Sequence, residues 1–252
     1  MSTVETAVGR FVWHDHMSDD PSAASRFYSD LLGWEIEVWK PGELDYPMIK
    51  VGEQTHGGFG PAQGGAPAHW VGHVLVDDAD AAAGRAEAAG GKSVAPAMDV
   101  PEVGRMVFVA DPQGAVVSLF APAGEMPPTE GVFNWDELVT TDVGDAKRFY
   151  GEVVGWESRD QDMGNDFTYT LFSSGGADRA GGMPQPAESA GAPAAWLTYV
   201  GTDDVNAAIE KARSLGVTTV FTEPTDVQGV GRLAVFADPT GAVVGLFEPI
   251  EA

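Results

Sequence analysis

The chain has 252 residues, of which 44% are hydrophobic, and it carries no cysteine and a formal net charge of −24. Without cysteine, disulfides, thiolate metal sites and a cysteine nucleophile are excluded. Such acidity repels phosphate backbones and anionic membranes, so we expect no nucleic-acid and no membrane partner. No apolar run approaches the ~20 residues of a membrane-spanning helix, and the first residues lack the basic flank and apolar core of a signal peptide. We therefore expect a cytoplasmic protein.

The first block of secondary structure covers residues 10–60 and begins with an apolar strand. Asp19 or Asp20 can cap the helix that follows, because a carboxylate there accepts hydrogen bonds from the first helical N–H groups. Pro21 suits the first turn of this helix, and Gly33 suits its end. Three short apolar segments, separated by Gly and Pro turns, complete the block. The pattern therefore predicts one βαβββ unit.

The same pattern recurs three more times, over residues 70–122, 132–184 and 196–249. In the first of these recurrences, Asp77 or Asp78 can cap the helix. The chain is therefore predicted to consist of four βαβββ units.

The two halves of the chain are near-copies of each other. The matching segments are residues 26–35 with 148–157, 57–59 with 181–183, and 110–120 with 237–247. A repeat period of roughly 125 residues indicates two domains rather than a solenoid. We predict domains over residues 1–122 and 132–252, joined by a Pro- and Gly-rich linker at 123–131. The Asp-Pro-x-Gly step in the last pair of segments is turn chemistry, so it predicts a closing hairpin rather than an active site.

Four βαβββ units, a Phe-Tyr…Gly-Trp motif at the end of the first helix of each half and an Asp-Pro-x-Gly…Leu-Phe motif in the last hairpin together resemble the vicinal oxygen chelate superfamily. This is the glyoxalase, bleomycin-resistance and extradiol-dioxygenase group. The chain looks most like its two-domain actinobacterial glyoxalase-like members, often labelled hydroxylases or secreted antigens. The resemblance implies an α+β fold of two tandem domains, whose curled sheets form cups that hold ligands. A second domain supplies what a dimer partner supplies in shorter relatives, so we expect a monomer.

The resemblance also indicates where a metal site would lie in this chain. Metal-dependent members carry His, Gln or Glu at four strand positions in each domain. In this chain the equivalent positions are Trp13, Gly58, Val71 and Ser118 in the first half, and Trp135, Gly182, Leu197 and Gly245 in the second. None of these side chains is a good ligand, so we expect no metal and no cofactor.

Candidate catalytic residues lie in the first half, which holds all five histidines. Strand alternation puts Asp15 on the same face as Trp13, and the same parity brings His73, with His56, towards the cup. We expect Asp15 to act as a base or orienting group, with a pKa raised by the neighbouring indole, and His56 and His73 to carry protons. Two alternatives stay open: these are polar residues scattered on strand ends, or they form a displaced metal site.

His14 and His16 lie on the other face of the same strand. As a His-x-His pair they would bind a metal only if that face were open, and in this fold we expect a helix to cover it.

An apolar cup with a few polar groups is the usual form of a small-molecule site. The residues expected to contact a ligand are Trp13, Met17, Phe59, Trp135, Glu137 and Tyr199. The first hypothesis is a protein that binds a hydrophobic or aromatic small molecule and carries out metal-independent acid–base chemistry in secondary metabolism. The alternatives are a non-catalytic drug- or partner-binding protein, and a divalent-metal lyase or dioxygenase. The sequence leaves open whether the protein is an enzyme.

Overall fold

The computed structural model describes residues 8–40, 45–124, 131–164, 167–189 and 191–250. The first half contains β1 (Phe11–Ser18), α1 (Pro21–Leu32), β2 (Glu35–Trp39), β3 (Tyr46–Val51), β4 (Gln54–Pro61), β5 (His69–Leu75), α2 (Ala79–Ala88), β6 (Lys92–Ser93), β7 (Met98–Val100), β8 (Gly104–Ala110) and β9 (Val116–Pro122). The second half contains β10 (Phe133–Thr140), α3 (Val143–Val154), β11 (Glu157–Asp162), β12 (Thr168–Ser174), β13 (Ala177–Pro184), a 3₁₀ turn (Ala187–Ser189), β14 (Ala195–Gly201), α4 (Val205–Ser214), β15 (Thr219–Val227), β16 (Gly231–Ala237) and β17 (Val243–Pro249).

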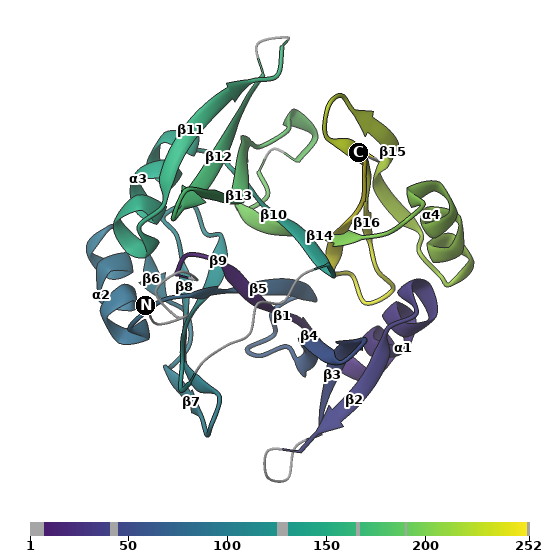
Figure 1. The fold of residues 1–252 in the computed structure, drawn as a ribbon, viewed down its shortest axis with the longest axis horizontal. Helices are drawn as coiled ribbons and strands as arrows, with labels where there is room; N and C mark the ends of the chain where they lie inside the picture. Colours follow the sequence, from purple (N-terminus) through teal and green to yellow (C-terminus); the bar gives the residue numbers. More distant parts are fainter. Residues whose placement is uncertain (1–7, 41–44, 125–130, 165–166, 190, 251–252) are drawn as a thin grey trace. The chain divides into compact units, whose positions relative to one another are not determined.

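The strands form two sheets, one from each half of the sequence (Figure 1). The strand order is β2-β3-β4-β1-β5-β9-β8-β6 in the first sheet, where β7 also pairs with β8, and β11-β12-β13-β10-β14-β17-β16-β15 in the second. Within each repeat the first strand pairs in parallel with the last, and the other neighbours are antiparallel. The prediction of an α+β fold with four βαβββ units is confirmed. The predicted linker at 123–131 lies mostly outside the described residues.

Helix caps decide where the helices begin and end. The Asp20 side chain accepts a hydrogen bond from the Ala23 N–H, and Asp78 caps α2 in the same way, so the second aspartate of each pair is the cap. Gly33 ends α1 in the left-handed conformation, at φ 74°, which glycine adopts without steric cost. None of the described helices is long and apolar enough to span a membrane.

Close contacts divide the chain into two compact units that do not follow the two sequence halves. Unit 1 takes the described parts of residues 1–12, 72–128 and 135–196, and therefore combines most of the second and third repeats. Unit 2 takes the rest, and combines most of the first and fourth repeats.

Unit 1 is built around the packing of α2 against α3, which lie side by side (Figure 1). Small alanines of α2 allow this close approach, while Phe149 and Tyr150 of α3 are fully buried. Trp156 and Trp196 complete the core, and the Trp156 indole donates a hydrogen bond to the Gly9 carbonyl at 2.8 Å.

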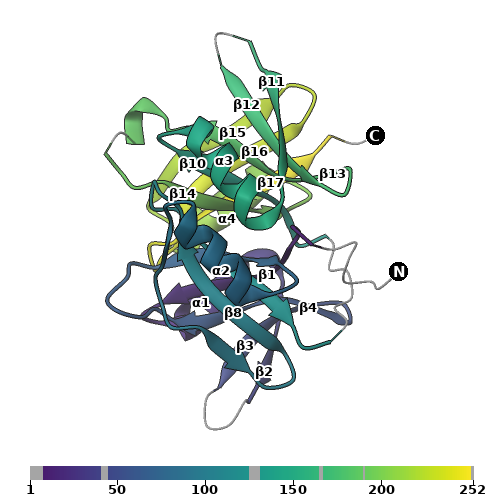
Figure 2. The ribbon, with the colours of Figure 1, turned by 90° about the vertical axis from the view of Figure 1, so that its left-hand side faces the viewer.

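Unit 2 repeats this arrangement with α1 and α4, which also pack together (Figure 1), whereas Figure 2 shows α2 and α3 of unit 1 next to each other. Tyr28 of α1 is fully buried among Trp34, Phe59 and Trp70. Both units therefore take one helix from each half of the sequence.

Strand register corrects one match between the halves. Asp15 pairs with Gly58, whereas Glu137, the equivalent of Asp15, pairs with Gly181. Gly58 therefore corresponds to Gly181. The sequence match of residues 57–59 with 181–183 had paired it with Gly182, one residue further along the chain. His56 consequently corresponds to Arg179.

Candidate functional site

β1 presents two chemically different faces to its surroundings. Its buried side chains are Val12, His14, His16 and Ser18, and they alternate with half-buried Phe11, Trp13, Asp15 and Met17. On the buried face, His14 stacks on Phe133 with ring centroids 4.1 Å apart, and the His16 ring meets Tyr28 of α1 edge-on. A helix residue thus packs on His16, as expected for this face, whereas His14 meets a residue of β10.

Asp15 lies in a hydrogen-bonded cluster with two aromatic side chains. The Trp13 Nε1–H donates to Asp15 Oδ1 and to the Tyr46 hydroxyl, each at 3.0 Å. The Tyr46 hydroxyl in turn donates to Asp15 Oδ1. Gly58, opposite Asp15 on β4, makes room for this arrangement, since a Cβ there would overlap the Tyr46 hydroxyl. We call Trp13, Asp15 and Tyr46 the first cluster.

The second half builds the same cluster with a longer carboxylate. Trp135 Nε1–H donates to the Tyr169 hydroxyl at 2.8 Å, and that hydroxyl donates to Glu137 Oε2 at 2.8 Å. A Cβ on Gly181 would overlap the Tyr169 hydroxyl. The structure therefore joins the predicted residues Trp135 and Glu137 through a tyrosine, and we call these three residues the second cluster.

The electrostatics of both clusters keep the tyrosines protonated. Burial, followed by the charge of Asp15, raises the pKa of Tyr46 well above its usual value. Burial and the charge of Glu137 raise the pKa of Tyr169 in the same way. Each tyrosine is therefore a fixed hydrogen-bond donor to a carboxylate, and the carboxylate is the proton acceptor of its cluster.

Two other predicted residues of the first repeat lie on different faces of the sheet. Met17 is on the Asp15 face, where its Sδ lies 3.1 Å from the position of a Cβ on Gly60. Phe59 pairs with His16 and packs against it and Tyr28, so it belongs to the core of unit 2.

His56 occupies a β-bulge. Ile49 pairs with Gly57 and Lys50 pairs with Thr55, which leaves His56 as the extra residue on β4. Alternation along a strand does not hold across a bulge, so counting by twos from Gly58 does not place this side chain. His56 is buried, and burial lowers its pKa.

His73 belongs to unit 1 and is buried, with Phe108 and Phe120 meeting its ring edge-on. It pairs with Ser118 in the register of β5 and β9. At the equivalent place in the second half, Tyr199 pairs with Gly245, and a Cβ on Gly245 would overlap the Tyr199 ring.

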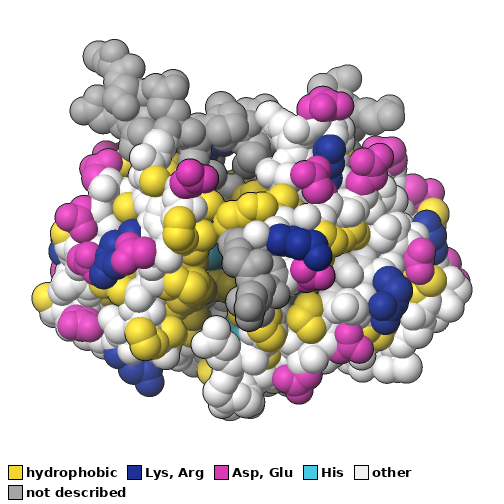
Figure 3. All heavy atoms as spheres, turned by 90° about the horizontal axis from the view of Figure 1, so that it is seen from below, with side chains coloured by type: hydrophobic (Ala, Val, Ile, Leu, Met, Phe, Trp, Pro, Cys, Tyr) yellow, Lys and Arg dark blue, Asp and Glu magenta, His cyan; other side chains and the backbone are white. Residues whose placement is uncertain are grey.

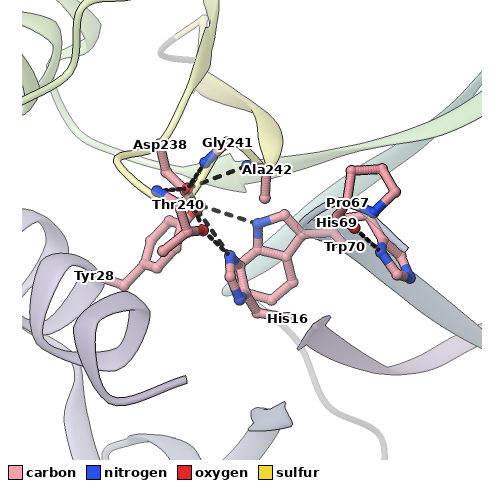
Figure 4. Close-up of polar contacts among 9 residues, drawn as sticks. All are labelled: His16, Tyr28, Pro67, His69, Trp70, Asp238, Thr240, Gly241 and Ala242. Carbon is pink, nitrogen blue, oxygen red and sulfur yellow. Dashed lines mark hydrogen bonds and ion pairs between the residues drawn. The ribbon is translucent and has the colours of Figure 1, made fainter. Parts of the chain in front are cut away.

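Another polar cluster, centred on Asp238, lies in unit 2 on the helix-covered face (Figure 4). The sequence analysis did not predict it. His16 Nε2 lies 2.8 Å from Asp238 Oδ2, and both side chains are fully buried. The Tyr28 hydroxyl donates to the same carboxylate oxygen at 3.0 Å and accepts from Trp70 Nε1–H at 3.0 Å. Thr240 Oγ1 donates to Asp238 Oδ1 at 2.6 Å. This aspartate is the one in the Asp-Pro-x-Gly turn, so the turn also ties β16 and β17 to α1.

Unit 1 contains the equivalent cluster without a histidine. Trp196 Nε1–H donates to the Tyr150 hydroxyl at 2.9 Å, and that hydroxyl donates to Asp111 Oδ2 at 3.2 Å. Leu138 replaces His16 on the equivalent strand and is fully buried. Burial raises the pKa of Asp111. Burial acts on Asp238 too, but the donors from His16 and Thr240 outweigh it and leave its pKa below the usual value.

Comparison with known proteins agrees with this architecture. A family model of the glyoxalase/bleomycin resistance protein/dioxygenase superfamily matches residues 132–246, and a glyoxalase-like domain model matches residues 12–120. The Mycobacterium tuberculosis protein named "Putative glyoxylase CFP32" is 33% identical over 247 residues, which is 94% of each chain.

The chain belongs to the glyoxalase/bleomycin resistance/dioxygenase superfamily. The anthracycline biosynthesis protein DnrV of Streptomyces peucetius is 31% identical over 262 residues, covering 96% of this chain and 94% of its own. Among solved structures, the Mn(II)-bound glyoxalase from Novosphingobium aromaticivorans has a TM-score of 0.64 at 19% identity, over 97% of this chain and 83% of its own. The 2,3-dioxygenase LapB from Pseudomonas sp. KL28 has a TM-score of 0.65 at 15% identity, over 96% and 93%. These two structures show a shared fold.

Several of the described residues at the positions where the resemblance places a metal do not fit one. Trp13 and Trp135 offer only N–H donors, which cannot ligate a cation. The space beside Gly58 is filled by Tyr46, and the space beside Gly245 by Tyr199. In the part of the chain that the structure describes, no group of three or more His, Asp or Glu side chains could hold a metal ion.

Tyr46 and Tyr169 are the site residues that sequence reasoning missed. Each stands twelve residues before the glycine that accommodates it, Gly58 or Gly181. This shared spacing was the available signal, although only the folded sheet shows that each hydroxyl reaches a carboxylate on another strand.

Proposed function

We propose that the protein binds an oxygen-bearing aromatic small molecule at the first cluster, and that Asp15 acts there as a general base. The observation that carries the proposal is the Asp15 carboxylate, held beside a half-buried indole by donors from Trp13 and Tyr46. A carboxylate fixed in this way is positioned before a ligand arrives.

The aromatic character of the ligand follows from the indole. Trp13 is half-buried, so part of its ring is not taken up by the core. Its N–H already donates to Asp15 and Tyr46, which fixes the ring plane for stacking on a planar ligand. The relatives named for anthracycline biosynthesis support a polycyclic aromatic ligand of this kind.

The chemistry would be proton abstraction from a carbon that is conjugated with a carbonyl group through the ring system. Asp15 takes a proton from a ligand carbon, and the C–H electron pair moves into the ring system to give an enolate on the carbonyl oxygen. Tyr46 is a positioning residue, because its raised pKa keeps its proton in place and its hydroxyl holds the carboxylate. No step requires a metal ligand from this chain.

Anthrone, a tricyclic ketone with an acidic CH₂ group, provides a direct test. In deuterated buffer without oxygen, we expect the wild-type protein to accelerate deuterium incorporation at that carbon, measured by mass spectrometry. Asp15→Asn should lower the rate about 100-fold or more, the usual contribution of a general base. Tyr46→Phe should shift the pH profile of exchange, since it changes the environment of Asp15.

Glu137→Gln is the matched control, because it alters the equivalent carboxylate of the second cluster and leaves Asp15 intact. Saturable anthrone binding without any exchange, equal in wild type and Asp15→Asn, would refute the base and favour the non-catalytic binding protein. Absence of both binding and exchange would refute the proposed function itself.

A further inference from the structure

A pocket of about 520 Å³ lies in unit 2, beside the N-terminal end of α4. Its lining comes from the segment just before α4, the turn between β15 and β16, and the end of β17. Two of the lining residues, Arg232 and Glu248, face each other in the register of β16 and β17. Glu248 Oε2 accepts a hydrogen bond from the Val205 N–H of α4 at 3.0 Å. The pocket therefore lies on the face of the sheet that α4 covers, whereas Gly245, three residues before Glu248, faces the other side.

Arg232 lacks a hydrogen-bond partner that its equivalent has in the second repeat. There Asp80 binds Arg105 with both oxygens, accepting from Nε at 2.7 Å and from Nη2 at 2.9 Å. In the fourth repeat Asn206 replaces Asp80 and accepts only from Arg232 Nη2, at 3.1 Å. The buried Arg232 Nε has no partner among the described residues. A buried donor without a partner costs free energy, so Arg232 would gain from one more acceptor.

This arginine differs from the general state of the basic side chains in this acidic chain. On the face that Figure 3 shows, most Lys and Arg side chains lie next to acidic ones. Arg105 is bonded to Asp80 and Asp99, and Arg213 to Glu210 and Glu223. An arginine with an unpartnered Nε at the edge of a pocket is therefore a place where a ligand atom would bind favourably.

The rest of the pocket lining is acidic and apolar. Asp203 and Glu248 contribute carboxylates, and a third carboxylate, that of Asp226, accepts from Arg232 Nη1 at 2.5 Å. Ile250 adds an apolar side chain that is 57% exposed. In the described part of the chain, no group of three or more His, Asp or Glu side chains could hold a metal ion. The carboxylates of this pocket therefore suit an organic cation with an apolar skeleton.

We infer that this pocket binds a small apolar amino alcohol, in which the amine and the hydroxyl group are on neighbouring carbons. The ammonium group donates hydrogen bonds to the carboxylates of Asp203 and Glu248, and the hydroxyl oxygen accepts one from Arg232 Nε–H. Because Nε is buried, the exposed side chain of Asn206 turns aside to let the oxygen reach it. The inference goes beyond the proposed function, since it concerns another part of the molecule and a ligand of different charge.

The test compares three probes with the same six-membered ring: aminocyclohexanol with its two groups on neighbouring carbons, cyclohexylamine without the hydroxyl, and cyclohexanol without the amine. Dissociation constants are measured by titration calorimetry at low salt, because salt screens the charges. We expect the wild type to bind the amino alcohol about tenfold more tightly than cyclohexylamine, the effect of one added hydrogen bond to a charged group, and to bind cyclohexanol most weakly. Asn206→Asp, which copies Asp80, should occupy Arg232 Nε and reduce this ratio of affinities to about one.

A second pair of variants tests the carboxylate. Glu248→Gln should weaken the binding of both amines about tenfold, because it removes the charge and keeps an oxygen for the Val205 N–H. Glu223→Gln is the matched control, since it removes a carboxylate of the same unit that binds Arg213 and lies outside the pocket lining. Weaker amine binding in Glu248→Gln but not in Glu223→Gln supports the inference. Equal losses in the two variants, an unchanged ratio in Asn206→Asp, or no binding of the amino alcohol by the wild type overturns it, and the anthrone assay tests the proposed function separately.

Discussion

His16 and Leu138 occupy equivalent positions on β1 and β10, and the difference between them changes the chemistry of a buried aspartate. Asp238 accepts hydrogen bonds from His16, Tyr28 and Thr240, and its pKa is lowered. Asp111, its equivalent in unit 1, accepts a hydrogen bond from Tyr150 but none from a histidine, and burial raises the pKa of Asp111. The side-chain donors of His16 and Thr240, which Asp111 lacks, thus favour the charged form of Asp238.

We predict that His16→Leu, which copies the residue of unit 1, destabilises unit 2 at neutral pH. Loss of a hydrogen bond to a buried carboxylate costs about 1–3 kcal/mol. Because the pKa of Asp238 is lowered on folding, its stabilising contribution is present above the unfolded value of about 4 and is lost as the pH falls through the folded value. The variant should therefore differ most from wild type at pH 7 and least at pH 3, in urea unfolding experiments.

Leu138→Met serves as the control, because it changes the equivalent buried position without touching Asp238. Its stability difference from wild type should not depend on pH. An equal loss in His16→Leu at pH 7 and pH 3 would show that packing, and not the carboxylate, accounts for the effect.

At the scale of single elements, β4 and β13 leave room for the two clusters because each has a glycine opposite the carboxylate. Gly58 and Gly181 lie opposite Asp15 and Glu137, and the tyrosine hydroxyls fill the space that a Cβ would need. The glycines are therefore required by close approach of a side chain and not by a turn.

Gly58→Ala should displace Tyr46 and break the first cluster. Overpacking of this kind typically costs about 1–3 kcal/mol, and the anthrone exchange rate should fall because Asp15 loses its donor. Gly60→Ala, on the same strand, is the control, since its Cβ would meet only the flexible side chain of Met17. Thermal unfolding and the exchange assay check both variants. Equal effects of the two substitutions would contradict the role assigned to Gly58.

At the scale of the whole molecule, the repeats are paired across the sequence halves. The core of unit 1 draws Val74 and Ala82 from the first half and Phe149 and Trp156 from the second. The core of unit 2 likewise combines α1 with α4. Neither half of the sequence contains a complete core of either unit.

We therefore predict that residues 1–124 and 125–252, produced as separate chains, depend on each other to fold. Each alone exposes the apolar faces of two helices and should self-associate or remain unfolded, because burial of these faces supplies the main driving force. Mixed together, they should form a 1:1 complex with cooperative unfolding, measured by size-exclusion chromatography with light scattering and circular dichroism. Two independently folded monomers would contradict this pairing.

The sequence by itself determined the repeats, the helices and the chemical type of the strands. These follow from local chemistry: Asp20 and Asp78 cap helices, Gly33 ends one, and alternation along β1 separates Asp15 from His16. The family also followed from local motifs, because the Phe-Tyr…Gly-Trp and Asp-Pro-x-Gly segments recur in order.

Only the tertiary structure decided which distant residues meet. Tyr46 reaches Asp15 from another strand, and Asp238 reaches His16 from a turn 222 residues away. Neither contact produces a periodic pattern in the sequence. The bulge at His56 also breaks the alternation on which its placement depended. Local patterns report the faces and ends of elements, whereas the clusters depend on register and on the pairing of repeats, which are set by packing of the folded chain.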